Sequence, residues 1–189
     1  ALYKLADAGV RVPVPYGCFD GILLMELILD EEGDVAPRLN DIQLTAEQAR
    51  RDHKTMMQDI LRMLSVGLVH GDLSEFNVLQ DPQGPVIIDL PQAVDAAANN
   101  NAQWMLERDV NNITQYYAQF APELAATKYA KEIWALFEAG NLNPNTELTG
   151  EFAEAEQAAD VGAVLDEINA AFAEMQERKE RQQAANEPD

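Results

Sequence analysis

LVHGDLSEFNVL, residues 68–79, sets the polar side chains of His70, Asp72 and Asn77 among apolar residues. Because Asp and Asn are common turn residues, one interpretation is that they only shape a loop. The other interpretation is a site that binds a metal ion and a nucleotide. The residues that follow this stretch distinguish the two.

A second carboxylate lies at the end of the next apolar run. Residues 78–80 and 85–89 are predicted to form a short β-hairpin around the turn DPQG. This hairpin would fold Asp89 back beside the loop that carries Asp72 and Asn77. Phosphoryl transfer requires such a set, because a carboxylate orients the acceptor hydroxyl while oxygen ligands hold Mg²⁺.

The spacing of these residues matches a known signature. Kinases carry H-R-D-L-x-x-x-N followed by an Asp-led motif, and this chain has HGDLSEFN followed by Asp89-Leu90-Pro91. A pair of Asx turns would explain two of the polar residues, but not the full set with its flanking apolar strands. The stretch between Asp89 and Asp109 is too short for a conventional activation loop and holds no Ala-Pro-Glu motif. We therefore expect a phosphotransferase that is not an ordinary protein kinase.

At these residues the chain resembles the RIO-type atypical serine/threonine protein kinases, most closely their first subfamily, and a bacterial member is expected. In this family a small residue replaces the Arg of the ordinary catalytic loop, as Gly71 does here. The resemblance covers residues 1 to about 140. The matching segments are AGVRVPVPYG, LLMELI, LVHGDLSEFNVL, IIDLPQAV and MLERDVNNITQYY.

The resemblance implies a role for each matched position. Asp72 would be the catalytic aspartate, and Asn77 and Asp89 would be metal ligands. In an ATPase cycle, Asp89 would be the residue that becomes phosphorylated. Met25 would occupy the gatekeeper position beside the adenine. The implied cofactors are ATP and Mg²⁺, with Mn²⁺ as an alternative. The backbone groups that would hydrogen-bond the adenine edge are those of Glu26 and Ile28.

Three other polar residues have structural interpretations. Asp109 lies in a predicted helix, where Asp is a poor helix former. Our hypothesis is that it accepts hydrogen bonds from backbone amides of the catalytic loop, and the alternative is a solvated charge beside Arg108. His70 is expected to support the loop by packing and hydrogen bonding rather than to act as a base. His53 is expected to be a surface or packing histidine rather than a ligand.

The predicted fold class is α+β: a protein-kinase-like C-terminal lobe that is mainly helical, with a hinge strand, a small β-hairpin and a truncated N-terminal lobe. The apolar run at residues 22–28 is predicted to be a buried strand. The predicted helices comprise one that ends at Gly9, one from Thr45 to near Gly67, and two at residues 102–118 and 122–139.

Three regions are predicted along the chain. Residues 1–28 would hold the end of the C helix, a remnant strand and the hinge, and residues 29–150 the kinase-like C-lobe. Residues 151–189 are predicted to be an acidic tail rich in Ala and Glu that is helical or disordered.

The amino-acid composition of the chain restricts the classes of partner that it can bind. With 13 basic residues and a net charge of −20, direct nucleic-acid binding is not expected. The acidity suits either solubility or a basic partner. The single cysteine, Cys18, excludes an intramolecular disulfide and fits a reducing compartment. No apolar run is long enough to span a membrane, so no membrane association and a cytoplasmic location are expected.

Several kinase elements are not found in this sequence. It has no Gly-x-Gly motif, and neither the strand lysine nor the C-helix glutamate of a kinase can be placed in it. We therefore expect a fragment of a longer kinase that acts on a protein substrate, with a link to ribosome assembly implied by the family. Two other functions stay open. One is a small-molecule phosphotransferase of the aminoglycoside or choline kinase kind, and the other is a non-catalytic acidic interaction module.

Overall fold

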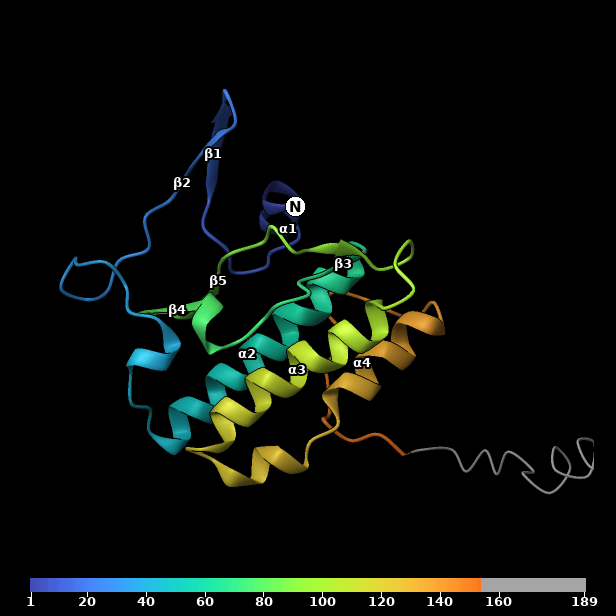
Figure 1. Cartoon of the computed structure of the whole chain (residues 1–189). Coiled ribbons are helices and arrows are strands. Elements are labelled where there is room, and N and C mark those ends of the chain that lie inside the picture. The colour runs from blue at the N-terminus through green and yellow to red at the C-terminus, as the bar shows by residue number, and fades with distance from the viewer. Residues whose placement is uncertain (154–189) are drawn as a thin grey trace, which may run out of the picture. The chain divides into compact units, whose positions relative to one another are not determined.

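Three helices that lie side by side build the core: α2 (Ala46–Ser65), α3 (Ala102–Ala118) and α4 (Tyr129–Glu138) (Figure 1). The computed structural model describes residues 1–153. Apolar residues recur along these helices at a spacing that places them on one face, and that face is buried. Large side chains with no more than 1% exposure in this core include Met56, Leu61, Leu106, Ile113 and Ile133.

The boundaries of α2 follow from its terminal residues. The Thr45 hydroxyl accepts a hydrogen bond from the Gln48 N–H at 3.2 Å, and the Gln48 side chain accepts one from the Thr45 N–H at 3.0 Å. This capping box satisfies amide groups that have no partner within the helix. Beyond the other end, Gly67 has a φ of 76°, a left-handed conformation that favours glycine. Both predicted boundaries of α2 are confirmed.

Short antiparallel strand pairs complete the described part of the chain. The pairs are β1 (Pro15–Phe19) with β2 (Ile22–Met25), β3 (Leu68–Val69) with β6 (Val94–Asp95), and β4 (Val78–Asp81) with β5 (Gly84–Ile87). The last pair is the predicted hairpin, with Val78 opposite Ile87. α1 (Leu2–Asp7) ends just before Gly9, as predicted. The structure is therefore mixed α/β, in agreement with the coarse fold class, while the assignment to a kinase lobe stays a prediction.

The strand predicted at residues 22–28 forms in part, but the prediction that it is buried is wrong. β2 forms, but all of its residues are exposed, with Ile22 at 72% and Met25 at 46%. Among the described residues, β1 is the strand that pairs with β2. Pairing satisfies the backbone, whereas burial of the side chains requires a second layer on the sheet. Ile28 is buried instead, beyond the end of the strand, in a small cluster with Val86.

The predicted helix at residues 122–139 is interrupted. Pro122–Ala126 form the 3₁₀ turn η3, and α4 begins only at Tyr129. Thr127 has an extended backbone, with φ −71° and ψ 151°, and its hydroxyl donates to the Leu124 carbonyl at 2.7 Å. Threonine side chains offer the backbone such a local alternative to a helix. The apolar periodicity does not reveal this break.

The predicted acidic tail lies almost entirely outside the described residues, so its structure stays a prediction, as do the three predicted regions. The segment between β2 and α2 contains the 3₁₀ turn η1 (Leu39–Asp41). Within residues 1–153, no helix combines the length and the apolar character needed to cross a membrane.

His53 on α2 is a packing histidine, as predicted. Its side chain is 1% exposed, and Nε2 lies 2.9 Å from the Thr114 hydroxyl on α3. The ring packs edge-on against Tyr117 and Tyr129, with centroids 5.8 Å and 5.5 Å away. Burial lowers the pKa of His53 to about 4, because the charged form cannot be solvated there. His53 is therefore neutral at physiological pH.

We predict that His53 makes the fold sensitive to mild acid. A histidine whose pKa is lowered on folding destabilises the protein as pH falls from the unfolded value of about 6.5 towards the folded value of about 4. Compared with His53→Gln, the wild type should lose roughly 3 kcal/mol of unfolding free energy between pH 7 and pH 4. Urea denaturation of both proteins at the two pH values measures this difference. A difference that does not change with pH would contradict the account.

Candidate active site

Asn77 makes a hydrogen bond across the loop that follows β3. This loop ends in the 3₁₀ turn η2 (Glu75–Asn77), after which β4 begins. The Asn77 side chain donates from Nδ2 to the Asp72 carbonyl at 2.7 Å. This bond orients the amide and leaves its oxygen, Oδ1, as the atom that could face a cation. The carboxylate of Asp72 is exposed, so it can reach a bound substrate.

Both backbone polar groups of Ile88, the residue before Asp89, are hydrogen-bonded. The Ile88 N–H donates to the Asn77 carbonyl at 2.9 Å, and the Ile88 carbonyl accepts a hydrogen bond from His70 Nε2 at 3.0 Å. His70 is buried, so its predicted supporting role is confirmed. Asp89 itself has a φ of 64°, a left-handed conformation that Asp tolerates better than most residues. Its side chain is exposed.

Asp109 on α3 binds the backbone of the loop at residues 70–77, the predicted catalytic loop. Its Oδ2 accepts a hydrogen bond from the Gly71 N–H at 2.8 Å, and Oδ1 accepts one from the Leu73 N–H at 3.0 Å. The side chain is 1% exposed, so the hypothesis of amide bonding is confirmed and the alternative of a solvated charge is wrong. Burial raises the pKa of Asp109 above its ordinary value, although the two amides and Arg108 act in the opposite direction.

Gly71 occupies a position where a larger residue does not fit. Its φ is 80°, and a Cβ added to it would lie 2.9 Å from the Gln92 carbonyl oxygen. The segment that follows Asp89 therefore passes directly over the catalytic loop at this point. This contact gives a physical reason for a small residue immediately before Asp72.

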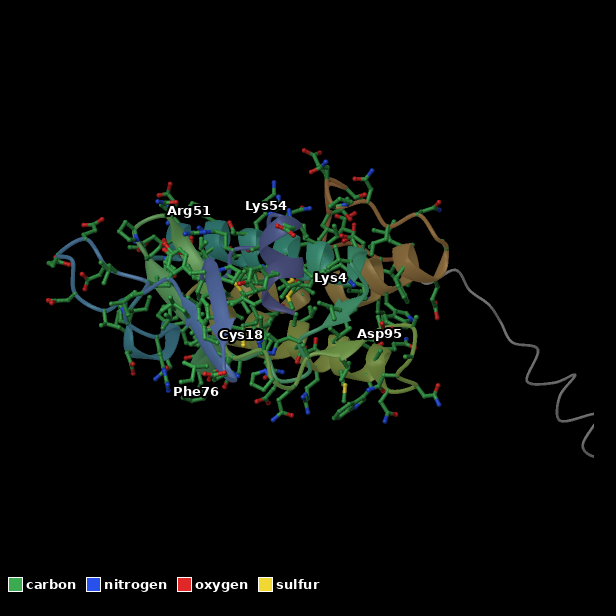
Figure 2. All side chains as sticks on the ribbon, turned by 90° about the horizontal axis from the view of Figure 1, so that it is seen from above. Lys4, Cys18, Arg51, Lys54, Phe76 and Asp95 are labelled. Atoms are coloured by element: carbon green, nitrogen blue, oxygen red, sulfur yellow. The ribbon has the colours of Figure 1, made fainter. Side chains whose placement is uncertain are left out.

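A cavity of about 500 Å³ lies beside Asp89. Met25 and Asp89 both line it, so the structure brings the predicted gatekeeper and the predicted metal ligand together. Cys18, which Figure 2 shows on the β1–β2 hairpin, also lines the cavity. The remaining lining residues are Ala1, Leu2, Tyr3, Pro13, Leu23, Ile88, Leu90 and Pro91. Apart from Asp89, the wall is mostly apolar, which suits the faces of an aromatic ring.

Glu26 and Ile28 do not line this cavity. The Glu26 N–H donates to the Val14 carbonyl at 2.8 Å, and the Ile28 carbonyl accepts a hydrogen bond from the Ala36 N–H at 2.9 Å. These bonds involve neither the Glu26 carbonyl nor the Ile28 N–H. Their role in nucleotide binding stays a prediction.

The donor set at the candidate metal site is small. No group of three or more His, Cys, Asp or Glu side chains within residues 1–153 is arranged to hold a metal ion. The predicted set is instead one amide oxygen, from Asn77, and one carboxylate, from Asp89. Mg²⁺ commonly binds in this way, because it keeps several water molecules and takes further oxygens from the phosphates of its substrate. The residues present therefore fit a cation that arrives with a nucleotide.

Two further α3 residues contact the catalytic loop and were not assigned to it from the sequence. Arg108 donates from Nη2 to the Gly71 carbonyl, and Asn112 donates from Nδ2 to the Leu73 carbonyl at 3.1 Å. Their spacing of four residues places them on one face of α3, and Asn112 lies three residues after Asp109. That shared face was the available signal in the sequence.

Comparisons with known proteins identify the family. The chain matches the family described as the RIO domain over residues 1–131. The RIO-type serine/threonine-protein kinase Rio1 of Haloferax volcanii is 36% identical over 116 residues, which cover 61% of this chain and 39% of that protein. The protein of the same name from Thermoplasma acidophilum is 33% identical over 132 residues, covering 70% and 67%. The chain belongs to the RIO domain family, as the sequence predicted.

A relative with a different name is also similar. The RIO-type serine/threonine-protein kinase Rio2 of Methanocaldococcus jannaschii is 31% identical over 116 residues. The chain spans 39% and 40% of the lengths of the Haloferax and Methanocaldococcus proteins. Membership of this family supports a kinase-like function.

We predict that Asp109→Asn destabilises the fold. An amide offers one acceptor oxygen where Gly71 and Leu73 present two donors, so one buried N–H loses its partner. The expected loss is about 2 kcal/mol of unfolding free energy, measured by urea denaturation at pH 7.

Asp95→Asn is the matched control for this prediction. Asp95 (labelled in Figure 2) also accepts two backbone N–H groups, from Ala97 and Ala98, but both bind its Oδ1 and the residue is exposed. The amide oxygen of Asn can keep both bonds, and water can replace either one. The loss of unfolding free energy in Asp95→Asn should stay below about 0.5 kcal/mol. Equal losses in the two variants would show that the buried contact of both Asp109 oxygens with Gly71 and Leu73 is not what matters.

Proposed function

We propose that this chain carries the phosphoryl-transfer site of a RIO-type protein kinase or ATPase, which uses ATP and Mg²⁺ and transfers the terminal phosphoryl group to a protein serine or threonine. The observation that carries this proposal is the position of Asn77. Its side chain binds the Asp72 carbonyl, and its backbone carbonyl binds the N–H of Ile88, next to Asp89. One residue thus connects the loop of the catalytic aspartate to the segment of the second carboxylate.

In this proposal each polar residue has a separate task. Asp72 is exposed and orients the acceptor hydroxyl, from which it accepts the proton. The Asn77 amide oxygen and the Asp89 carboxylate hold the cation. Bound Mg²⁺-ATP supplies the phosphoryl group and the positive charge that neutralises the phosphates. Met25 and the apolar cavity wall receive the adenine. The backbone groups of Glu26 and Ile28, which lie outside the cavity lining, are proposed to hydrogen-bond the adenine edge.

The family match supports a protein substrate rather than an aminoglycoside or an amino alcohol. The relatives are named serine/threonine-protein kinases, and this proposal extends that activity to the present chain. A substrate connected with ribosome assembly is also part of the proposal, and it rests on the family resemblance alone.

We predict that Asp72→Asn and Asp89→Asn each remove activity, but in different ways. Asp72→Asn should lower kcat for ATP turnover and autophosphorylation by about 10²- to 10⁴-fold, because the general base is lost. Asp89→Asn should in addition shift the Mg²⁺ dependence to higher concentration, because one anionic ligand is lost. The assay uses the longest open reading frame that contains this sequence, because the chain spans only part of several relatives.

Asp95→Asn again serves as the control, since Asp95 is an exposed aspartate outside the site. It should retain the wild-type rate. Wild-type rates in both Asp72→Asn and Asp89→Asn would refute the proposed function. Phosphoryl transfer only to an added aminoglycoside or amino alcohol would favour the small-molecule phosphotransferases.

A further inference from the structure

One helix binds the backbone on both sides of Asp72. Asp109 accepts the N–H groups of Gly71 and Leu73. Arg108 donates to the Gly71 carbonyl and Asn112 to the Leu73 carbonyl. All four backbone polar groups of the two residues that flank Asp72 are therefore bound by side chains of α3.

The carboxylate of Asp72 depends on these backbone contacts for its direction. It is exposed, and no hydrogen bond to its oxygens is found in the part of the chain that the structure describes. Two peptide groups adjoin Asp72. The one that follows it is bound at both ends, because Asn77 binds its carbonyl and Asp109 its N–H. The one that precedes it is bound at its carbonyl by Arg108.

The peptide group held by Arg108 is the one most able to rotate. It follows Gly71, which lacks a Cβ and has a φ of 80°. The backbone of glycine has more accessible conformations than that of any other residue. A contact is therefore needed to select one conformation at Gly71. The Arg108 guanidinium supplies that contact. It lies in turn over the ring of Trp104, with its central carbon 4.9 Å from the ring centroid.

We propose that Arg108 and Asn112 are positioning residues for phosphoryl transfer. By holding the carbonyls of Gly71 and Leu73, they set the direction in which Asp72 presents its carboxylate to the acceptor hydroxyl. Trp104 assists by stacking on the guanidinium of Arg108. This inference rests on the proposed function, because it assigns a role in the same site. It differs from the role of Asp109, whose buried carboxylate also stabilises the fold.

The positioning role predicts a separation of kcat from KM. Arg108→Ala should lower kcat roughly 10- to 100-fold, since a misplaced base loses alignment with the acceptor. KM for ATP should stay within about twofold, because neither residue lines the nucleotide cavity. Arg108→Lys should recover part of kcat, because an ammonium group can still donate to the Gly71 carbonyl. Asn112→Ala should have a smaller effect in the same direction.

Gln58→Ala is the matched control for these variants. The Gln58 amide donates to the Pro144 carbonyl at 2.8 Å, so the variant also removes a bond from a side chain to a loop carbonyl. It should leave kcat unchanged. If Arg108→Ala reduces kcat no more than Gln58→Ala does, Arg108 is only structural and the inference is wrong.

The outcomes of this test separate the inference from the proposed function. If Asp72→Asn is inactive while Arg108→Ala keeps the wild-type kcat, only the inference fails. If the wild type does not turn over ATP, both fail. A second readout does not require turnover: NMR relaxation dispersion at the Asp72 amide should be silent in the wild type and should appear in Arg108→Ala. A silent Asp72 amide in that variant would also overturn the inference.

Discussion

Two hydrogen bonds from Gly71 and Leu73 to the buried carboxylate of Asp109 are the contacts on which the rest of the site depends. They fix the predicted catalytic loop to α3, which packs against both α2 and α4 (Figure 1). A buried carboxylate is costly unless it is hydrogen-bonded, so the interaction specifies one arrangement of loop and helix. The loop in turn holds Asn77, and through Ile88 it holds the segment of Asp89.

The residues of the candidate site fall into a buried group and an exposed group. The side chains that shape it, His70 and Asp109, are at most 2% exposed, and they bind backbone groups. The carboxylates proposed to act on substrate and cation, Asp72 and Asp89, are exposed. This division suits phosphoryl transfer, in which the protein contributes mainly positioning and electrostatic stabilisation. It also allows α3 to support the proposed reaction although the residues proposed to react, Asp72 and Asp89, lie outside that helix.

The sequence predicts those parts of the structure that local chemistry determines. The capping residue Thr45 and the terminal Gly67 place α2, and the turn at residues 81–84 places the hairpin. Asp109 is found because a poor helix former within a helix needs an explanation. The exposure of β2 is not predictable from its apolar run, because burial depends on a layer that lies elsewhere in space. Arg108 shares a helix face with Asn112, but its partner, Gly71, is distant in sequence, so that face alone does not identify the contact.

The central claim is that oxygens of Asn77 and Asp89 meet at one divalent cation beside Asp72. A crystal structure of the protein with Mn²⁺ and a non-hydrolysable ATP analogue tests it most directly, because Mn²⁺ gives an anomalous signal. The account predicts one anomalous peak about 2.1 Å from Asn77 Oδ1 and from an Asp89 carboxylate oxygen, which is the distance typical of Mg²⁺ sites. A nucleotide bound in the cavity with its cation away from both residues would contradict it.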